Sequence, residues 1–313
     1  MGFRKIIGFG DSSFVVSLPK EWVQRNGLKK GDTINVEEEA SELKLSPQNI
    51  KQSQINKEVN IKFDGNLKLL KSQLFNSYIH NFSTININMK GINSNYSSIK
   101  KLVNDFVALD IIQSSDDKII IKDYLNIQDI SIHEKMRRMD RIVMSMFEDV
   151  QDVLKGNFNK KEFLNDRDEE VNKIYTLILK LLKRAMINPN DRKILNLKIE
   201  EVFYYWDLSS WVEEVADQLK RIVRYVNLKV DRPVLELFDL AYENYKQSMK
   251  ANFTGNLDLC LDIMNLRKDV ADKCESCAKS LGVESMLILE RIKTVHNCTG
   301  NISKAYIKLG VKA

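Results

Sequence analysis

Four oxygen-bearing side chains stand in two pairs, each with a spacing of four residues, within segments that have helical periodicity. Asp168 and Asn172 form one pair, and Glu213 and Asp217 form the other. Residues i and i+4 of a helix lie on one face, with about 5–6 Å between their Cβ atoms. Antiparallel packing of two such helices would bring the four side chains together, where carboxylates repel unless a cation or a proton lies between them. Hard divalent ions and iron are suited to such oxygen ligands, so these residues could form a metal site. The alternative interpretation is that the two pairs lie on solvated helix faces and form Glu–Lys ion pairs.

A second group of metal-ligating residue types lies near the C-terminal end. Cys274 and Cys277 have the Cys-x-x-Cys spacing of zinc ligands, and His296 and Cys298 follow them. Both pairs lie within helical patterns that lack a knuckle glycine, and residues i and i+2 of a helix point apart. We therefore interpret the cysteines as small buried apolar side chains and His296 as a surface residue.

We find no catalytic motif in the chain. The di-iron chemistry of helical bundles needs Glu-x-x-His motifs, and none of His80, His133 and His296 has a glutamate three residues before it. A P-loop, a G-x-G-x-x-G loop and a G-x-S-x-G elbow are absent as well. We expect a protein without enzymatic activity.

The composition indicates a folded, helix-rich protein of several modules. The 313 residues are 43% hydrophobic and 29% charged, with only 12 Gly and 4 Pro. No run approaches 18 consecutive apolar residues, so we expect no membrane insertion. Arg4 and Lys5 precede no apolar signal-peptide core, and four cysteines are too few for a disulfide framework, so we expect a cytoplasmic location. The net charge of +5 alone identifies no nucleic-acid partner.

Residues 1–48 predict a small β module around one short helix. Pro19 suits the first turn of that helix and Gly27 suits its end. Residues 1–30 hold six cations and two anions, whereas residues 31–50 hold one cation and five anions, which indicates either one basic face or a salt-bridged surface. A module this small can hardly bury a core alone, so we expect it to interleave with a second copy as a homodimer. The expected strands cover residues 4–9, 14–18, 33–38 and 43–46.

The rest of the chain predicts a small α/β module at 49–130, followed by long amphipathic helices. Short connections between such helices predict antiparallel bundles, which we divide into 131–230 and 231–313. Their methionine and aromatic stripes are interpreted as core. In the middle module we expect helices near 65–80 and 97–109 and strands at 83–89, 110–114 and 118–122. In the bundles we expect a long helix over 193–230 and helices near 234–253, 256–281 and 284–309.

The N-terminal segment resembles the AbrB/SpoVT DNA-binding domain. The resemblance rests on Leu18-Pro19-Lys20 and on Leu28-Lys29-Lys30-Gly31-Asp32, and it covers nearly all of residues 1–48. It implies a swapped-hairpin dimer that binds DNA with basic residues, mostly by neutralising phosphates. The basic residues that match the family's, and that we expect to contact DNA, are Arg4, Lys5, Lys20 and Arg25.

The helical remainder resembles the PhoU phosphate-uptake regulator family, whose bundles carry two acidic motifs. Residues 168–175 look like the first motif, residues 213–217 look like the second, and residues 295–302 look like the second motif repeated. The resemblance implies a divalent metal or iron in the first bundle, although Asn172 replaces the usual Asp and implies weaker binding. The ligands that it implies are Asp168, Asn172, Glu213 and Asp217.

The second bundle departs further from the PhoU pattern. By alignment with the first motifs, Arg267 and Lys293 stand at acidic positions, and Ala271 and Asn297 stand at the two others. We therefore expect no metal in this bundle. Arg267 and Lys293 could instead meet around an anion.

An AbrB-like head joined to a PhoU-like body resembles archaeal phosphate-uptake regulators. The resemblance implies a multidomain α+β protein with a swapped-hairpin β module, a small α/β module and two PhoU-like bundles. It also implies a dimeric, DNA-binding regulator of phosphate uptake, whose body senses metal or phosphate or binds phosphate-transport or signalling proteins. The alternative, which the acidic residues 32–42 favour, is a dimeric adaptor that binds a transporter component or a signalling kinase but no DNA.

Overall fold

The computed structural model describes residues 3–39, 42–47, 57–279 and 281–310. They belong to two compact units, Met1–Asn56 and Lys57–Ala313, which we call the N-terminal unit and the C-terminal unit. The mixed α+β fold class expected from the sequence is confirmed: small antiparallel strands come first, a mixed sheet follows, and helices complete the chain.

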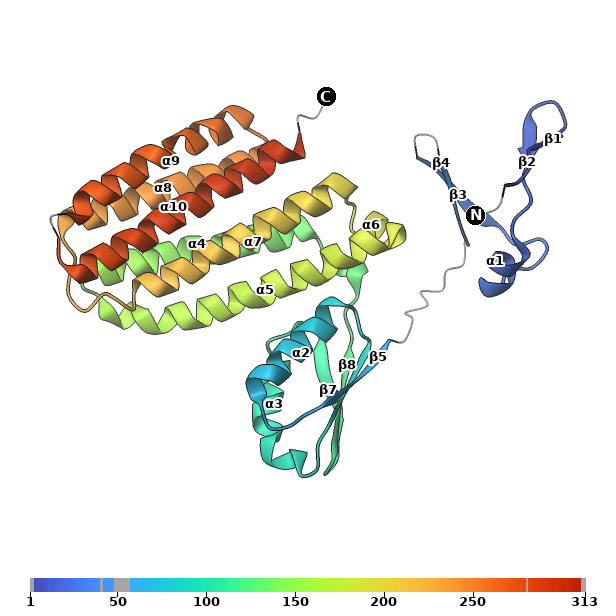
Figure 1. Ribbon diagram of the computed structural model, residues 1–313, viewed down its shortest axis with the longest axis horizontal. Coiled ribbons are helices and arrows are strands. Elements are labelled where there is room, and N and C mark those ends of the chain that lie inside the picture. The colour runs from blue at the N-terminus through green and yellow to red at the C-terminus, as the bar shows by residue number, and fades with distance from the viewer. Residues whose placement is uncertain (1–2, 40–41, 48–56, 280, 311–313) are drawn as a thin grey trace. The chain divides into compact units, whose positions relative to one another are not determined.

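The N-terminal unit consists of two antiparallel hairpins and one short helix (Figure 1). Gly27 follows the helix with a φ of 64°, a conformation that favours glycine, so the predicted helix stop is confirmed. None of the described residues of this unit is buried, so these residues form no apolar core. The elements are β1 (Ile7–Phe9), β2 (Ser13–Val15), α1 (Lys20–Arg25), β3 (Ile34–Glu39) and β4 (Glu42–Pro47).

A four-stranded sheet in the order β5-β6-β8-β7 opens the C-terminal unit, with α2 and α3 on one face (Figure 1). Only β5 and β6 are parallel, and α2 crosses over between them. Buried apolar residues of the sheet and the two helices form one cluster, which includes Leu70, Leu74 and Ile99. The elements are β5 (Glu58–Lys62), α2 (Leu67–Ile79), β6 (Thr84–Asn88), α3 (Tyr96–Val103), β7 (Leu109–Ser114) and β8 (Lys118–Asp123).

Two expectations for this sheet need correction. The sequence assigned no strand to β5, whose short alternation of Val59 and Ile61 lies among polar residues and becomes a strand through pairing with β6. The helix expected over 97–109 ends at Val103, and Ala108 takes a left-handed φ of 64° before β7 begins.

Long helices make up most of the rest of the C-terminal unit, and long helices that follow one another along the chain run antiparallel (Figure 1). The helix expected over 193–230 is wrong at both ends. Its first residues belong to α6, and Asn196, with a left-handed φ of 51°, separates α6 from the next helix. That helix begins at Ile199, and the Lys198 N–H donates a hydrogen bond of 2.8 Å to the side chain of Glu201 in its first turn. The helices are α4 (Ile132–Leu154), α5 (Lys161–Ile187), α6 (Pro189–Ile194), α7 (Ile199–Ile222), α8 (Arg232–Thr254), α9 (Leu257–Ala278) and α10 (Val283–Leu309).

One apolar cluster runs through α4 to α10 and joins the two predicted bundles. At its centre, Phe147 of α4 packs against three aromatic rings of α8, and its ring is stacked on Tyr242 with 4.7 Å between centroids. The methionines and aromatic residues interpreted as core do lie there: Met136, Met139, Met146 and Phe147 are buried. Among the described residues, none of the helices combines the length and the apolar sequence that a membrane crossing needs.

Candidate functional site

The two acidic pairs lie on α5 and α7, which pack against each other. Asp168 is buried, and its Oδ2 lies 2.6 Å from the Nζ of Lys220 on α7. The Nδ2 of Asn172 donates to the same oxygen at 3.3 Å. The structure thus places the pairs on facing helices, as the spacing predicts, but a lysine ammonium lies where the two helices meet.

The second pair is engaged within α7 itself. Asp217 forms an ion pair of 2.6 Å with Arg221, which also lies 3.8 Å from Glu214. Glu213 forms no ion pair with any other described residue. Partial burial, followed by the repulsion of Asp217, Glu214 and Asp168, raises the pKa of Glu213 to about 7.

These side chains do not fit a metal as they are placed. Within the described ranges, no three His, Cys, Asp or Glu side chains are grouped so that they could hold an ion. The oxygens of Asp168 and Asp217 that a metal would need are engaged by Lys220 and Arg221. A metal at Asp168, Asn172, Glu213 and Asp217 remains a prediction from the sequence that the placement of these side chains does not support.

A pocket of about 490 Å³ lies beside the acidic pairs, between α5, α7 and the middle module. Asn172 and Glu213 line one side, and Lys71 and Phe75 of α2 line another. Lys71 also forms an ion pair of 3.4 Å with Asp105, another lining residue. The pocket mixes both signs of charge with aromatic rings, so it resembles neither a phosphate cradle nor a hard-metal site.

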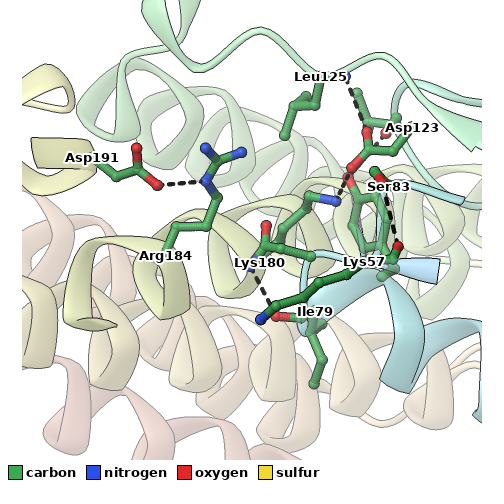
Figure 2. A network of polar contacts seen from close by, with 11 residues as sticks. Lys57, Ile79, Ser83, Asp123, Leu125, Lys180, Arg184 and Asp191 are labelled. Carbon is green, nitrogen blue, oxygen red and sulfur yellow. Dashed lines mark hydrogen bonds and ion pairs between the residues drawn. The ribbon is translucent and has the colours of Figure 1, made fainter. Parts of the chain in front are cut away.

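A buried lysine joins the middle module to the helices (Figure 2). Lys180 of α5 has no exposed surface, forms an ion pair with Asp123 of β8, and lies 3.9 Å from the ring centroid of Tyr78 on α2. Burial lowers the pKa of Lys180, and Asp123 partly restores it. The sequence analysis missed this residue. The available signal was one lysine inside the apolar run 177–182.

The cations of the second bundle have separate partners. The Nη2 of Arg267 donates to the carbonyl of Asn297 at 3.2 Å, and its side chain lies against Gly300. Lys293 forms an ion pair of 2.8 Å with Glu275. Each of the two cations therefore has its own partner within the protein.

The placement of His296 corrects the sequence analysis. We expected a surface residue, but the side chain is 1% exposed and its Nδ1 lies 3.4 Å from the Nδ2 of Asn244. Burial lowers the pKa of His296. Cys274 and Cys298 are buried in the apolar cluster of the helices, where they pack as small hydrophobic side chains.

The basic residues expected to contact DNA are exposed on the N-terminal unit. Arg4 and Lys5 precede β1, and Lys20 and Arg25 are the first and last residues of α1. None of the four forms an ion pair with another described residue. Their charge is therefore available to a partner.

The same unit also exposes a large apolar surface. Phe3, Ile6, Phe9 and Phe14 are 72–99% exposed, and Leu43 is 66% exposed. The register of β1 and β2 places Phe9 and Phe14 on opposite faces of their hairpin, and apolar exposure on both faces is typical of a module that another molecule covers.

Two family models match separate parts of the chain. Residues 9–53 match the family model described as antidote-toxin recognition MazE, bacterial antitoxin, and residues 136–226 match that of the PhoU domain. The chain joins a MazE-like head to a PhoU-like body. These matches confirm the architecture expected from the sequence, an AbrB-like head joined to PhoU-like helices.

The PhoU match covers most of α4 and all of α5, α6 and α7, which include the four acidic-motif residues. We call this segment, residues 136–226, the PhoU-like region, and residues 9–53 the MazE-like head. Arg4 and Lys5 precede the matched residues of the head. Among curated proteins, none matches the chain.

Proposed function

We propose that this protein is a homodimeric regulator of phosphate homeostasis, whose N-terminal unit binds DNA and whose helices bind a phosphate-transport or signalling protein. The occurrence of a MazE-like head and a PhoU-like region in one chain supports this proposal above all. The head supplies exposed cations that can neutralise DNA phosphates. The helices supply the PhoU-like region, which includes the two acidic motifs.

A second copy of the chain is the partner that the apolar surface of the N-terminal unit fits. The described residues of the unit bury no side chain, although β1 and β2 carry Ile7, Phe9, Phe14 and Val15. Burial of an apolar side chain of this size contributes about 1.5–3 kcal/mol, and an isolated module under 50 residues lacks a sufficient core. Interleaving of two copies would supply that core.

Substitution of Phe14 by aspartate should convert the dimer into a monomer. An unpaired charge is tolerated at a side chain that is 78% exposed, but not at one that a second copy covers. Light scattering coupled to size exclusion measures the change in mass. Phe203, 59% exposed on α7, provides the matched control, and Phe203→Asp should leave the dimer intact. A dimeric Phe14→Asp protein would exclude this surface as the interface.

The double substitution Arg4→Ala/Lys5→Ala should weaken DNA binding and make its affinity less dependent on salt concentration. Each lost phosphate contact lowers the slope of log K against log salt by about 0.9, so we expect a loss of about 2. The measurement is fluorescence anisotropy across a salt titration, with DNA from upstream of the cell's own phosphate-transport operon and a scrambled duplex. Lys100→Ala/Lys101→Ala removes the same charge from exposed positions of α3 and serves as the control.

The same titration decides between the two candidate functions. Tight, salt-sensitive and sequence-selective binding supports a transcription regulator. If neither duplex binds while the dimer remains intact, the chain acts as an adaptor, and the acidic residues of the head, such as Asp32 and Glu42, would explain the lack of affinity.

A further inference from the structure

The PhoU-like region has an excess of acidic side chains where α5 and α7 meet. Asp168 from α5 and Glu214 and Asp217 from α7 all repel the carboxylate of Glu213, which lies on α7. Like charges at such an interface need a compensating cation or a proton. The question is which group supplies the positive charge.

Lys220 supplies a cation at the buried end of this cluster. Its Nζ lies 2.6 Å from Oδ2 of Asp168, whose side chain is only 6% exposed, while the lysine side chain is 25% exposed. An N⁺–H···O⁻ contact of this length is a strong, charge-assisted hydrogen bond. Because Lys220 lies on α7 and Asp168 on α5, the ion pair spans the interface between the two helices.

Asn172 makes the same oxygen still less available to a metal. Its amide Nδ2 donates to Asp168 Oδ2 at 3.3 Å, so this oxygen accepts from both an ammonium and an amide. An asparagine here also removes one negative charge from the cluster. The cluster therefore carries one negative charge fewer than it would with an aspartate at position 172, and Lys220 supplies a positive charge to it.

Arg221 supplies a second cation to the cluster on its more exposed side. It lies 2.6 Å from Asp217 and 3.8 Å from Glu214, both on its own helix. Lys220 and Arg221 are consecutive, so one turn of α7 carries cations to both sides of the acidic cluster.

We infer that Lys220 is the resident cation of the PhoU-like region, and that its ammonium occupies the position that a divalent metal ion would need between α5 and α7. Asp168 and Asp217 are then each paired with a cation of the chain itself, and α5 and α7 pack together without a metal. Removal of the ammonium, with the carboxylate restored at position 172, opens a divalent-cation site. This inference is independent of whether the head binds DNA.

Calorimetric titration of the full-length protein with MnCl₂ tests the inference. Wild type should show no binding at concentrations up to about 1 mM. The Asn172→Asp/Lys220→Ala protein should bind Mn²⁺ at least tenfold more tightly than wild type, because Asp168, Glu213 and the carboxylate introduced at position 172 then have no lysine between them. Thermal unfolding should confirm the gain: Mn²⁺ should raise the melting temperature of the variant but not that of wild type.

Two control proteins test whether Mn²⁺ binding depends on removing the cation at position 220 or on removing any lysine. Lys220→Arg keeps the cation and should stay without Mn²⁺ binding. Lys293→Ala removes a lysine that aligns with Glu213 in the second motif and pairs with the largely exposed Glu275, so it should also gain no binding. Binding by wild type that disappears in Glu213→Gln would overturn the inference. Failure of the folded Asn172→Asp/Lys220→Ala protein to bind would overturn it as well.

A double-mutant cycle keeps the inference testable if the doubly substituted protein does not fold. Lys220→Met should lower the melting temperature strongly, because it leaves Asp168 buried without its cation, whereas Asp168→Asn/Lys220→Met should recover most of that loss. Independent, additive effects of the two substitutions would show that the ammonium does not neutralise Asp168.

Discussion

Replacement of Lys180 by alanine should destabilise the C-terminal unit by about 3–5 kcal/mol, because Asp123 would keep its charge inside the protein without a cation. Lys180 has no exposed surface, and the Asp123 side chain is 11% exposed. The substitution also removes the contact with the face of Tyr78, 3.9 Å from the ring centroid. Urea unfolding followed by circular dichroism measures the loss.

The neighbouring Lys183 provides a matched control for this experiment. It lies on the same helix and its Nζ is 2.7 Å from the Nε2 of His80, but the contact is exposed. Lys183→Ala should therefore change the free energy of unfolding by less than about 1 kcal/mol. Comparable losses in the two variants would contradict the role assigned to burial.

Removal of both partners should cost less than removal of one. In Asp123→Leu/Lys180→Met no charge is left unpaired, and buried ion pairs replaced by apolar groups are often neutral in stability. Recovery of at least half the Lys180→Ala loss is the expected result. Failure to recover would mean that the double variant loses as much stability through the missing hydrogen bond from Leu125 N to Asp123, 3.0 Å in the native protein, as it regains by removing the unpaired charge.

Substitution of Asp140 by asparagine should stabilise the protein at neutral pH by up to about 3 kcal/mol and should leave it unchanged or weaker near pH 4. Asp140 of α4 is 7% exposed, and its Oδ1 has no hydrogen-bond partner among the described residues. Burial raises its pKa to about 6, against weaker opposing effects of Tyr245, Arg141 and Arg137.

The sign of this effect follows from the raised pKa. The folded state binds a proton at Asp140 that the unfolded state, with a pKa near 3.8, has released between pH 4 and 6. The stability that protonation confers is complete below pH 3.8 and is lost as the pH rises through about 6. An asparagine is neutral at every pH, so the difference between variant and wild type should grow over this window and then remain constant.

Urea unfolding at half-unit steps from pH 4 to pH 8 measures this difference, in which titrations common to both proteins cancel. Asp262, exposed on α9, provides the control, and Asp262→Asn should change stability by less than about 0.5 kcal/mol. A difference for Asp140→Asn that does not vary with pH would contradict the raised pKa.

Much of the local structure follows from the sequence alone. Pro19 and Gly27 set the limits of α1 through backbone geometry that both residues impose by themselves. Helical periodicity placed the buried faces of α4 and α5, and each acidic pair lies on one face of its own helix because the i, i+4 spacing has that consequence in any helix. Motifs within residues 1–48 and along the helices also indicated an AbrB-like head and PhoU-like helices, and the MazE and PhoU family models match these two parts of the chain.

The tertiary structure decided how individual side chains are paired and buried. Lys180 and Lys183 are three residues apart on one helix, yet only Lys180 is enclosed, because β8 and α2 pack over that side of α5. His296 is buried for the same kind of reason, against Asn244 of α8. Lys220 lies 52 residues after Asp168 in the chain, and the two side chains pair only because α5 packs against α7. Spacing in the sequence fixes which face a side chain is on, but its charge environment depends on contacts between distant segments, and those form only when the helices pack.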